Sequence, residues 1–107
     1  MQYFYCMCSN MTEDQITLVF KALAHTERRR ILASLLQKPG QTLFDLCVAP
    51  DQPDGVRHLT RQTVSQHLDA LERAGLLEIS WQGRTKTHGL EPGPLRAAVQ
   101  QALAPYL

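Results

Sequence analysis

The chain has 107 residues, enough for one domain with a single hydrophobic core, and its content of 44% hydrophobic and 20% charged residues is typical of a globular protein. No apolar run approaches the roughly 20 residues that cross a bilayer, and residues 1–10 lack the regions of a signal peptide. We therefore expect a cytoplasmic protein without membrane contacts. The net charge of +1 neither proposes nor excludes nucleic acid, so such a partner must be argued from local charge.

Helical periodicity predicts two α-helices in the first third of the chain, at residues 12–24 and 25–37. The first helix begins with Thr12 as N-cap and Gln15 as its capping-box partner. Its apolar face carries Ile16, Val19, Phe20 and Leu23 at i, i+3, i+4 and i+7. The run Arg28 to Arg30 near the start of the second helix is interpreted as a solvated face or as ion pairs with the first helix.

The middle of the chain predicts a short helix, a loop and a longer helix. Thr42 caps the short helix at residues 42–47, and residues 48–59 have the prolines, glycine and aspartates of a loop. The longer helix, about residues 60–75, begins at Thr60 as N-cap and ends at Gly75, which suits a left-handed conformation. Its buried stripe is Val64, Leu68 and Leu71.

The last third predicts two strands and a terminal helix. The strands, residues 76–81 and 85–90, flank the connection "QGR". The helix at residues 94–106 starts near Pro92 and Pro94 and presents one apolar face, formed by Leu95, Val99, Ala102, Leu103 and Tyr106. The fold class is therefore mainly α, with five helices and a small two-stranded β-hairpin.

The outer face of the 60–75 helix has an unusual composition. A merely solvated helix face usually carries Glu and Lys at i, i+4 spacing, but the first two turns here contain no acid. They carry Arg61, Gln62, Ser65 and Gln66, with Thr63 and His67 on the flanks. These side chains can hydrogen-bond base edges and phosphates, and an acid-free helix N-terminus favours an anion. The pattern predicts contact with double-stranded DNA.

Two further basic residues lie at and just after the predicted hairpin tip, namely Arg84 and Lys86, where they can reach a groove or the DNA backbone. Between Arg57 and His88 the basic residues exceed the acidic ones by only two. So small an excess predicts modest non-specific affinity and a need for two copies of the domain on one DNA site.

Three segments resemble the ArsR/SmtB family of bacterial winged helix-turn-helix transcriptional repressors. They are "FKALAHTERRRILASL", "LTRQTVSQHLDALERAGLLEI" and "QGRTKTHGL", and the resemblance extends over about residues 16–99. The middle segment, with T-V-S-x-H-L followed by L-x-x-A-G-L, is the most specific. It resembles the family's recognition helix and first wing strand, and the last segment resembles the wing.

The resemblance implies a winged-helix domain at residues 12–107 preceded by a flexible N-terminal extension at residues 1–11. It also implies a homodimer held by the first and last helices, with the paired 60–75 helices in adjacent major grooves and the wings, residues 76–90, alongside. The residues we assign to dimerisation are Ile16, Phe20, Leu95, Val99, Ala102, Leu103 and Tyr106. An inverted-repeat operator and repression by promoter occlusion follow as expectations.

Position by position, the resemblance assigns DNA contacts to Thr60, Gln62, Thr63, Ser65, Gln66, His67 and the wing tip Arg84. Arg61 stands where the family more often has an uncharged polar residue, and the residue pattern adds Arg61 and Lys86 to the DNA-binding set. For His67 two interpretations remain open: a half-buried histidine bonded to the backbone, or a phosphate contact.

The chain departs from the family pattern in its connection and in its metal ligands. Residues 48–59 are longer than the three or four residues that usually join the helices of a helix-turn-helix. Thr42 and Phe44 stand where metal-sensing members carry Cys-x-Cys, and the last helix lacks the Asp and His pairs that other members use. We expect no cofactor and no typical metal site, and no inducer can be named.

Two alternative functions remain. Cys6, Cys8 and Cys47 could bind a soft metal or metalloid ion or respond to oxidation, which would make the protein a thiol-based sensor. Alternatively, the chain could be a protein-interaction or dimerisation module that has lost DNA binding. An enzyme is not expected, because the sequence has no P-loop, nucleophile elbow or H-E-x-x-H motif.

Overall fold

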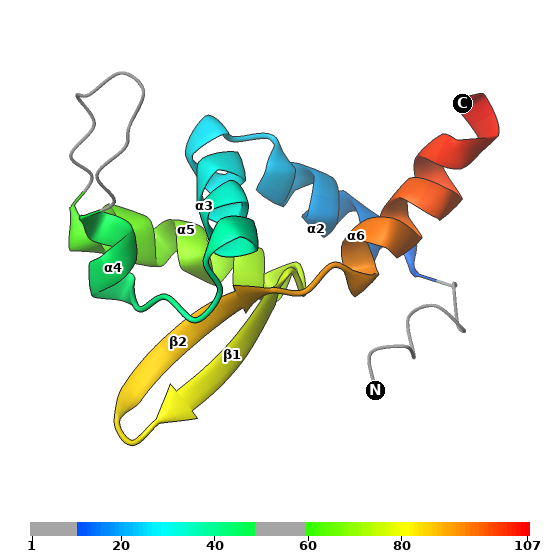
Figure 1. The fold of residues 1–107 in the computed structure, drawn as a ribbon. Helices are drawn as coiled ribbons and strands as arrows, with labels where there is room; N and C mark the ends of the chain where they lie inside the picture. Colours follow the sequence, from blue (N-terminus) through cyan, green and yellow to red (C-terminus); the bar gives the residue numbers. More distant parts are fainter. Residues whose placement is uncertain (1–10, 49–59) are drawn as a thin grey trace.

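The computed structural model describes residues 11–48 and 60–107, which form helices and one two-stranded antiparallel sheet (Figure 1). The elements in chain order are α2 (Glu13–Leu23), α3 (Thr26–Gln37), α4 (Leu43–Cys47), α5 (Arg61–Arg73), β1 (Leu77–Gln82), β2 (Thr85–Leu90), α6 (Gly93–Ala98), a π-helical turn (Val99–Leu103) and a 3₁₀ turn (Ala104–Tyr106). None of the helices in these two ranges is long and apolar enough to span a membrane.

Side-chain caps fix the starts of three helices where the sequence predicted them. The hydroxyl oxygens of Thr12, Thr42 and Thr60 accept hydrogen bonds from the backbone N–H groups three residues further on. At α2 and α4 the third residue also accepts from the cap's own N–H, which completes a capping box. Such caps satisfy backbone donors that the helix cannot pair, so the local sequence determines where these helices begin.

The core lies where α5 meets the helices before it and the first strand. Its stripe of Val64, Leu68 and Leu71 is buried, and α5 contacts α2, α3, α4 and β1. The other core residues come from every neighbouring element: Val19, Ala22, Ile31, Leu32, Leu35, Leu46, Ala74, Leu76, Leu77 and Ala98. The stripe predicted for the 60–75 helix is therefore confirmed, and its burial determines which face of α5 turns outward.

The β-hairpin projects from the helices and forms the wing (Figure 1). Gln82 pairs with Thr85, so its loop is Gly83 and Arg84, and Gly83 has a φ of 65° as tight hairpin loops require. Sequence analysis missed the attachment of its base: Gln41, in the α3–α4 connection, pairs with His88 on the free edge of β2. The Gln41 amide also donates to the carbonyl oxygens of Ser34 and Lys38 at the end of α3.

The end of the chain differs from the regular helix predicted at residues 94–106. Only Gly93–Ala98 is α-helical, after which the chain widens into the π turn and closes in the 3₁₀ turn. Pro105 gives the physical reason, because proline has no N–H to donate and its ring clashes with the carbonyl group four residues earlier. Met11, predicted to belong to the extension, packs on the core and donates its N–H to Oε1 of Gln101 at 3.1 Å.

Gly75 makes the turn from α5 into the wing, and its substitution provides a test of this turn. Its φ is 78°, and a Cβ added there would lie 3.2 Å from Cγ of Pro94. Gly40 is the matched control, since its φ is 86° but an added Cβ would meet no atom within 4 Å. We expect Gly40→Ala to lower the free energy of unfolding by about 1 kcal/mol through backbone strain, and Gly75→Ala to cost roughly 1 kcal/mol more through overpacking.

The measurement is urea unfolding of both variants and the parent chain. An equal loss in the two variants would show that the contact with Pro94 has no energetic consequence.

Candidate nucleic-acid interface

The first two turns of α5 present polar side chains away from the core. Arg61, Gln62 and Gln66 are exposed and Ser65 is half-buried, and none of these four side chains forms a hydrogen bond with another residue in the described ranges. No acidic residue lies in the first turn. The exposed donors and acceptors predicted for this surface are thus present on one face of the helix and available to a ligand.

Thr60 and Thr63 lie at the same end of α5 but have a structural task. The Thr60 hydroxyl oxygen accepts from the Thr63 N–H at 3.1 Å and lies 3.0 Å from the Thr63 hydroxyl oxygen. Because the Thr60 O–H donates to the Thr63 hydroxyl oxygen, the groups left to bind DNA are the Thr63 O–H, the remaining hydroxyl electron pairs and the backbone N–H groups beside them.

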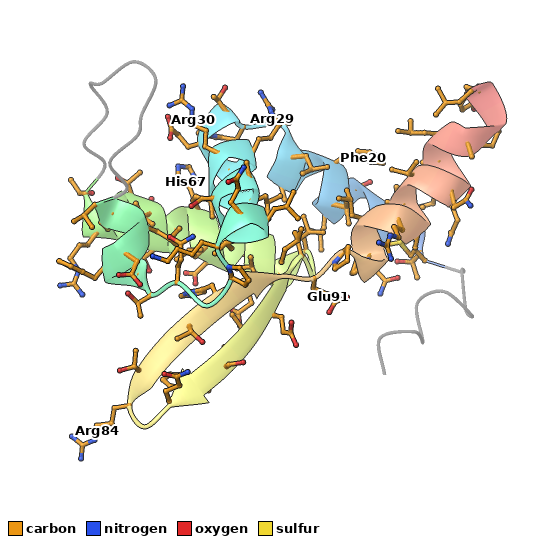
Figure 2. All side chains as sticks on the ribbon, viewed as in Figure 1. Phe20, Arg29, Arg30, His67, Arg84 and Glu91 are labelled. Atoms are coloured by element: carbon orange, nitrogen blue, oxygen red, sulfur yellow. The ribbon has the colours of Figure 1, made fainter. Side chains whose placement is uncertain are left out.

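The two basic residues of the wing have different surroundings. Arg84 is exposed in the hairpin loop, and its guanidinium points away from the body (Figure 2). Lys86 is half-buried, its Nζ lies 3.3 Å from Oε1 of Glu72 on α5, and it lies 6.0 Å from the centre of the Trp81 ring. Arg84 is therefore presented to a partner, whereas Lys86 links the wing to α5.

A groove of about 380 Å³ separates α5 from β2 and the start of α4. Arg61 and Ser65 line the groove near the N-terminus of α5, and Asp69 and Glu72 line it further along. Along α5 the groove favours an anion beside the first two turns, because the later turns carry carboxylates.

His67 lies inside the protein and not on the outward face. Its side chain is only 7% exposed, and its Nδ1 accepts a hydrogen bond from Nε of Arg28 at 3.3 Å. The geometry favours the structural interpretation over the phosphate contact, although the partner is a side chain and not the backbone. The signal was in the sequence: Val64, His67, Leu68 and Leu71 have the i, i+3, i+4, i+7 spacing of one buried face.

Two arginines at the start of α3 bind backbone carbonyl groups of the preceding helix, whereas the sequence predicted a solvated face or ion pairs with that helix. Arg28 and Arg29 donate to the carbonyl oxygens of Lys21 and Leu23, at 3.3 and 2.6 Å. These carbonyls belong to the C-terminal turn of α2, where cations are favourable. The bonds hold α2 against α3 and keep this pair of arginines from the predicted DNA surface.

The residues assigned to dimerisation lie on α2, on α6 and in the turns after it. Ile16 is buried within the protomer, whereas Phe20, Leu95, Val99 and Ala102 are half-buried. Leu103 and Tyr106 are 39% and 84% exposed, and Leu18 on α2 is also an exposed large apolar residue. The chain terminus therefore leaves apolar surface uncovered.

The cysteines provide little evidence for a metal site. Cys47 is half-buried and packs on the core, while Cys6 and Cys8 lie outside the described residues. Within residues 11–48 and 60–107, His, Cys, Asp and Glu side chains form no group of three that could hold a metal ion. The predicted loop at residues 48–59 is also outside the description, apart from Val48.

Comparison with known proteins agrees with this geometry. Residues 23–80 match the family described as a helix-turn-helix domain. The chain is 32% identical over 78 residues to the uncharacterized HTH-type transcriptional regulator YuzN of Bacillus subtilis (strain 168), an alignment covering 73% of this chain and 84% of the relative.

Solved structures show the same fold. An ArsR-like transcriptional regulator from Rhodococcus sp. RHA1 has 27% identity and a TM-score of 0.67, covering 82% of this chain and 76% of that one. Mb0332 from Mycobacterium bovis, a possible ArsR-family regulator whose winged helix-turn-helix DNA-binding domain is homodimeric, has 28% identity and a TM-score of 0.63, covering 86% and 80%.

The matching family and the fold are those of winged helix-turn-helix DNA-binding regulators, not of enzymes. The chain belongs to the ArsR family of transcriptional regulators.

The contrast between the wing's two basic residues gives a test by salt dependence. Log affinity for DNA falls as log salt concentration rises, and each lysine or arginine that neutralises a phosphate makes this negative slope steeper by close to one. We expect Arg84→Ala to reduce that slope by about 1. Lys86→Ala should change it less, because the Lys86 Nζ already lies 3.3 Å from the Glu72 carboxylate.

Fluorescence anisotropy of labelled duplex DNA at several salt concentrations provides the measurement. An unchanged slope for Arg84→Ala would remove the wing tip from the interface, and equal effects of both substitutions would show that Lys86 leaves Glu72 when DNA binds.

Proposed function

We propose that the protein is a repressor that binds an inverted-repeat operator as a homodimer and occludes a promoter. The observation that supports this most strongly is the acid-free outer face of α5, where Arg61, Gln62 and Gln66 are exposed. Glutamine can bond adenine through two atoms in the major groove, and arginine can do the same with guanine. Ser65 and the helix N-terminus would hold the neighbouring phosphate.

A dimer is favoured by the uncovered apolar surface and by the weakness of one DNA-binding face. Leu18, Leu103 and Tyr106 expose apolar area that a second copy would bury. One domain offers few phosphate contacts, so two domains on one operator would combine their affinities. The homodimeric solved relative is consistent with such an arrangement.

The proposed repressor acts in the cytoplasm, where its DNA is, and needs no cofactor to fold or to bind. Capping, core burial and the arginine bonds to α2 already stabilise the described residues. A thiol-based sensor using Cys6, Cys8 and Cys47 remains the alternative. Adding arsenite, cadmium or zinc to the protein–DNA complex would test it, and release of DNA by any of them would favour the sensor.

Gln66→Ala tests whether the outer face of α5 reads bases. We expect a loss of about 1 to 3 kcal/mol on the cognate operator and a smaller loss on random DNA. The matched control is Gln37→Ala, at an exposed position at the end of α3. The measurement compares the affinity of each protein for two duplexes. One is selected from the DNA upstream of the gene, and the other has a shuffled sequence.

Equal losses on the two duplexes would mean that Gln66 positions the backbone and reads no base. Absence of binding to any duplex by the parent chain would favour the protein-interaction module.

Leu103→Glu tests the dimer. Sedimentation equilibrium of the parent chain should give twice the 12.1 kDa mass of the chain. A charge in a buried interface is costly when unpaired, so the variant should sediment as a monomer and lose operator affinity. Leu36→Glu, at a 69% exposed position on α3, is the control and should remain dimeric. A monomeric parent chain at micromolar concentration would exclude the proposed assembly.

A further inference from the structure

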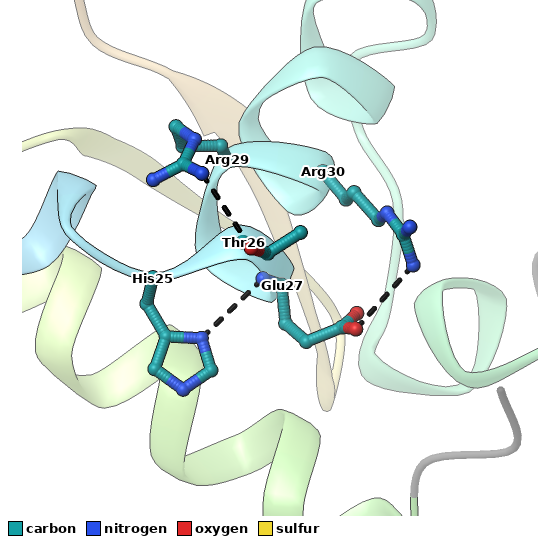
Figure 3. Close-up of polar contacts among 5 residues, drawn as sticks. All are labelled: His25, Thr26, Glu27, Arg29 and Arg30. Carbon is teal, nitrogen blue, oxygen red and sulfur yellow. Dashed lines mark hydrogen bonds and ion pairs between the residues drawn. The ribbon is translucent and has the colours of Figure 1, made fainter.

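Two histidine rings meet between the recognition helix α5 and the start of α3. His67 extends from the buried side of α5, and its ring centre lies 4.5 Å from that of His25, with the two planes inclined at 59°. His25 is the N-cap of α3, whose first turn is drawn in Figure 3. Neither ring belongs to the outward face proposed to bind DNA, so their contact needs its own explanation.

Both rings act as hydrogen-bond acceptors through Nδ1. Nδ1 of His25 accepts from the backbone N–H of Glu27 at 3.3 Å (Figure 3), and Nδ1 of His67 accepts from Nε of Arg28 at 3.3 Å. An imidazole nitrogen accepts only when it carries no proton, because both nitrogens of a protonated ring are donors. The two observed hydrogen bonds therefore require that Nδ1 of each ring carry no proton.

The surroundings of His67 oppose its protonation. Burial lowers the pKa of His67 below its ordinary value of 6.5, the neighbouring His25 and Arg28 lower it further, and Glu27 raises it. Glu27 is itself buried and bonded to Arg30 at 3.4 Å. These principal influences come from α3 and its cap. The titratable residues on α2, α4 and β1, which also pack against α5, are Glu13, Asp14, Lys21, Asp45, Cys47 and Glu78, and Lys86 of β2 bonds Glu72 on α5.

Arg28 connects the histidine pair to a third element. Its Nε donates to His67 and its Nη1 donates to the carbonyl oxygen of Lys21 at the end of α2. One guanidinium thus joins α2, α3 and α5. If Nδ1 of His67 gains a proton, the Nε–H of Arg28 faces another donor and a second positive charge. Loss of this bond removes a polar link between α5 and the helices α2 and α3.

We propose that His67, in contact with His25 and Arg28, is a proton-sensitive latch: its neutral ring holds α5 at the angle it needs to bind DNA, and its protonation weakens DNA binding. His67 is a positioning residue, since it acts through the seating of α5 and touches no DNA. The proposal rests on the DNA-binding function described above. It adds a regulatory signal to that function, namely a fall in pH. The residue that responds to it lies on the buried side of α5, opposite the proposed DNA surface.

The sign of the pH effect separates this role from a direct contact. A histidine bound to a phosphate would be stabilised as the cation, so acid would strengthen binding. In the latch, the DNA-bound state disfavours the proton, so operator affinity should be constant near neutral pH and should fall as pH drops through the pKa of His67, which lies below its ordinary value of 6.5. We expect affinity to decline in acid by at most about tenfold per pH unit, because only one proton is coupled to binding.

The experiment compares the parent chain with His67→Asn and His25→Asn at constant ionic strength. Asparagine places an oxygen acceptor near the position of Nδ1 but does not titrate, and it is also a good helix N-cap. Operator affinity of His67→Asn should be nearly independent of pH, and that of His25→Asn should lose part of its dependence. Circular dichroism at each pH confirms that the chains remain folded.

A parent affinity that rises or stays constant in acid would overturn the proposal, as would a His67→Asn variant with the full pH dependence of the parent.

A second readout does not use DNA and keeps the proposal distinct from the proposed function. The folded state disfavours the proton on His67, so the unfolded chain binds it first. The free energy of unfolding should then fall as pH drops below 6.5, and less so in His67→Asn. Backbone amide NMR signals of residues 61–66 should shift as the His67 ring titrates.

If those amides do not respond while the ring titrates, the latch does not exist. If they respond but no DNA is bound at any pH, the DNA-binding function fails and the seating of α5 by His67 stands.

Discussion

Burial of one stripe of α5 is the constraint from which the rest of the interface follows. Val64, Leu68 and Leu71 are almost completely buried, and α5 packs against α2, α3 and α4, which precede it in the chain, and against β1, which follows it. Successive helical residues are rotated by a fixed angle, so burying these three side chains directs Gln62 and Gln66 outward. The same rotation directs His67 inward, toward Arg28. One hydrophobic contact thereby gives α5 an outer polar face and a titratable inner one.

Charge divides α5 along its length as well as around it. Its N-terminal turns lack acids and leave the positive end of the helix open to an anion, while its later turns carry Asp69 and Glu72. Glu72 bonds Lys86, so part of the wing's positive charge is neutralised within the protein. Although such an exposed ion pair contributes at most about 1 kcal/mol to stability, it orients the wing relative to α5. The placement of charge, and not its total, distinguishes the N-terminal turns of α5 from the rest of the helix.

The features that depend on neighbouring residues could be predicted from the sequence. Thr12, Thr42 and Thr60 cap their helices by bonds within one turn, and the stripe of α5 repeats with the period of the helix. Bonds between distant residues could not be predicted. Arg28 and His67 are 39 positions apart, and Gln41 and His88 are 47 apart. Nothing in the local pattern of either residue specifies its partner, because only the packed fold brings them together.

The C-terminal region shows a different limit. Its apolar period predicted one regular helix, but Pro105 prevents the ordinary bonding pattern at the end. The apolar period alone does not determine the backbone there, because the regular helix ends at Ala98. By contrast, side-chain types alone were enough to predict the outer face of α5, because its first turn has no acids where a solvated helix usually has them.

The attachment of β2 to Gln41 also affects how the wing can move. Backbone bonds join His88 to Gly40 and Gln41, and the Gln41 amide holds the last carbonyl groups of α3. The base of the wing cannot open without breaking these bonds, so it belongs to the same cooperative unfolding unit as the end of α3. The loop at Gly83 and Arg84 has no such attachment within the described chain. In the described chain, the base of the wing is thus bonded to the helical body, and Arg84 lies at the end of the wing that has no such bonds.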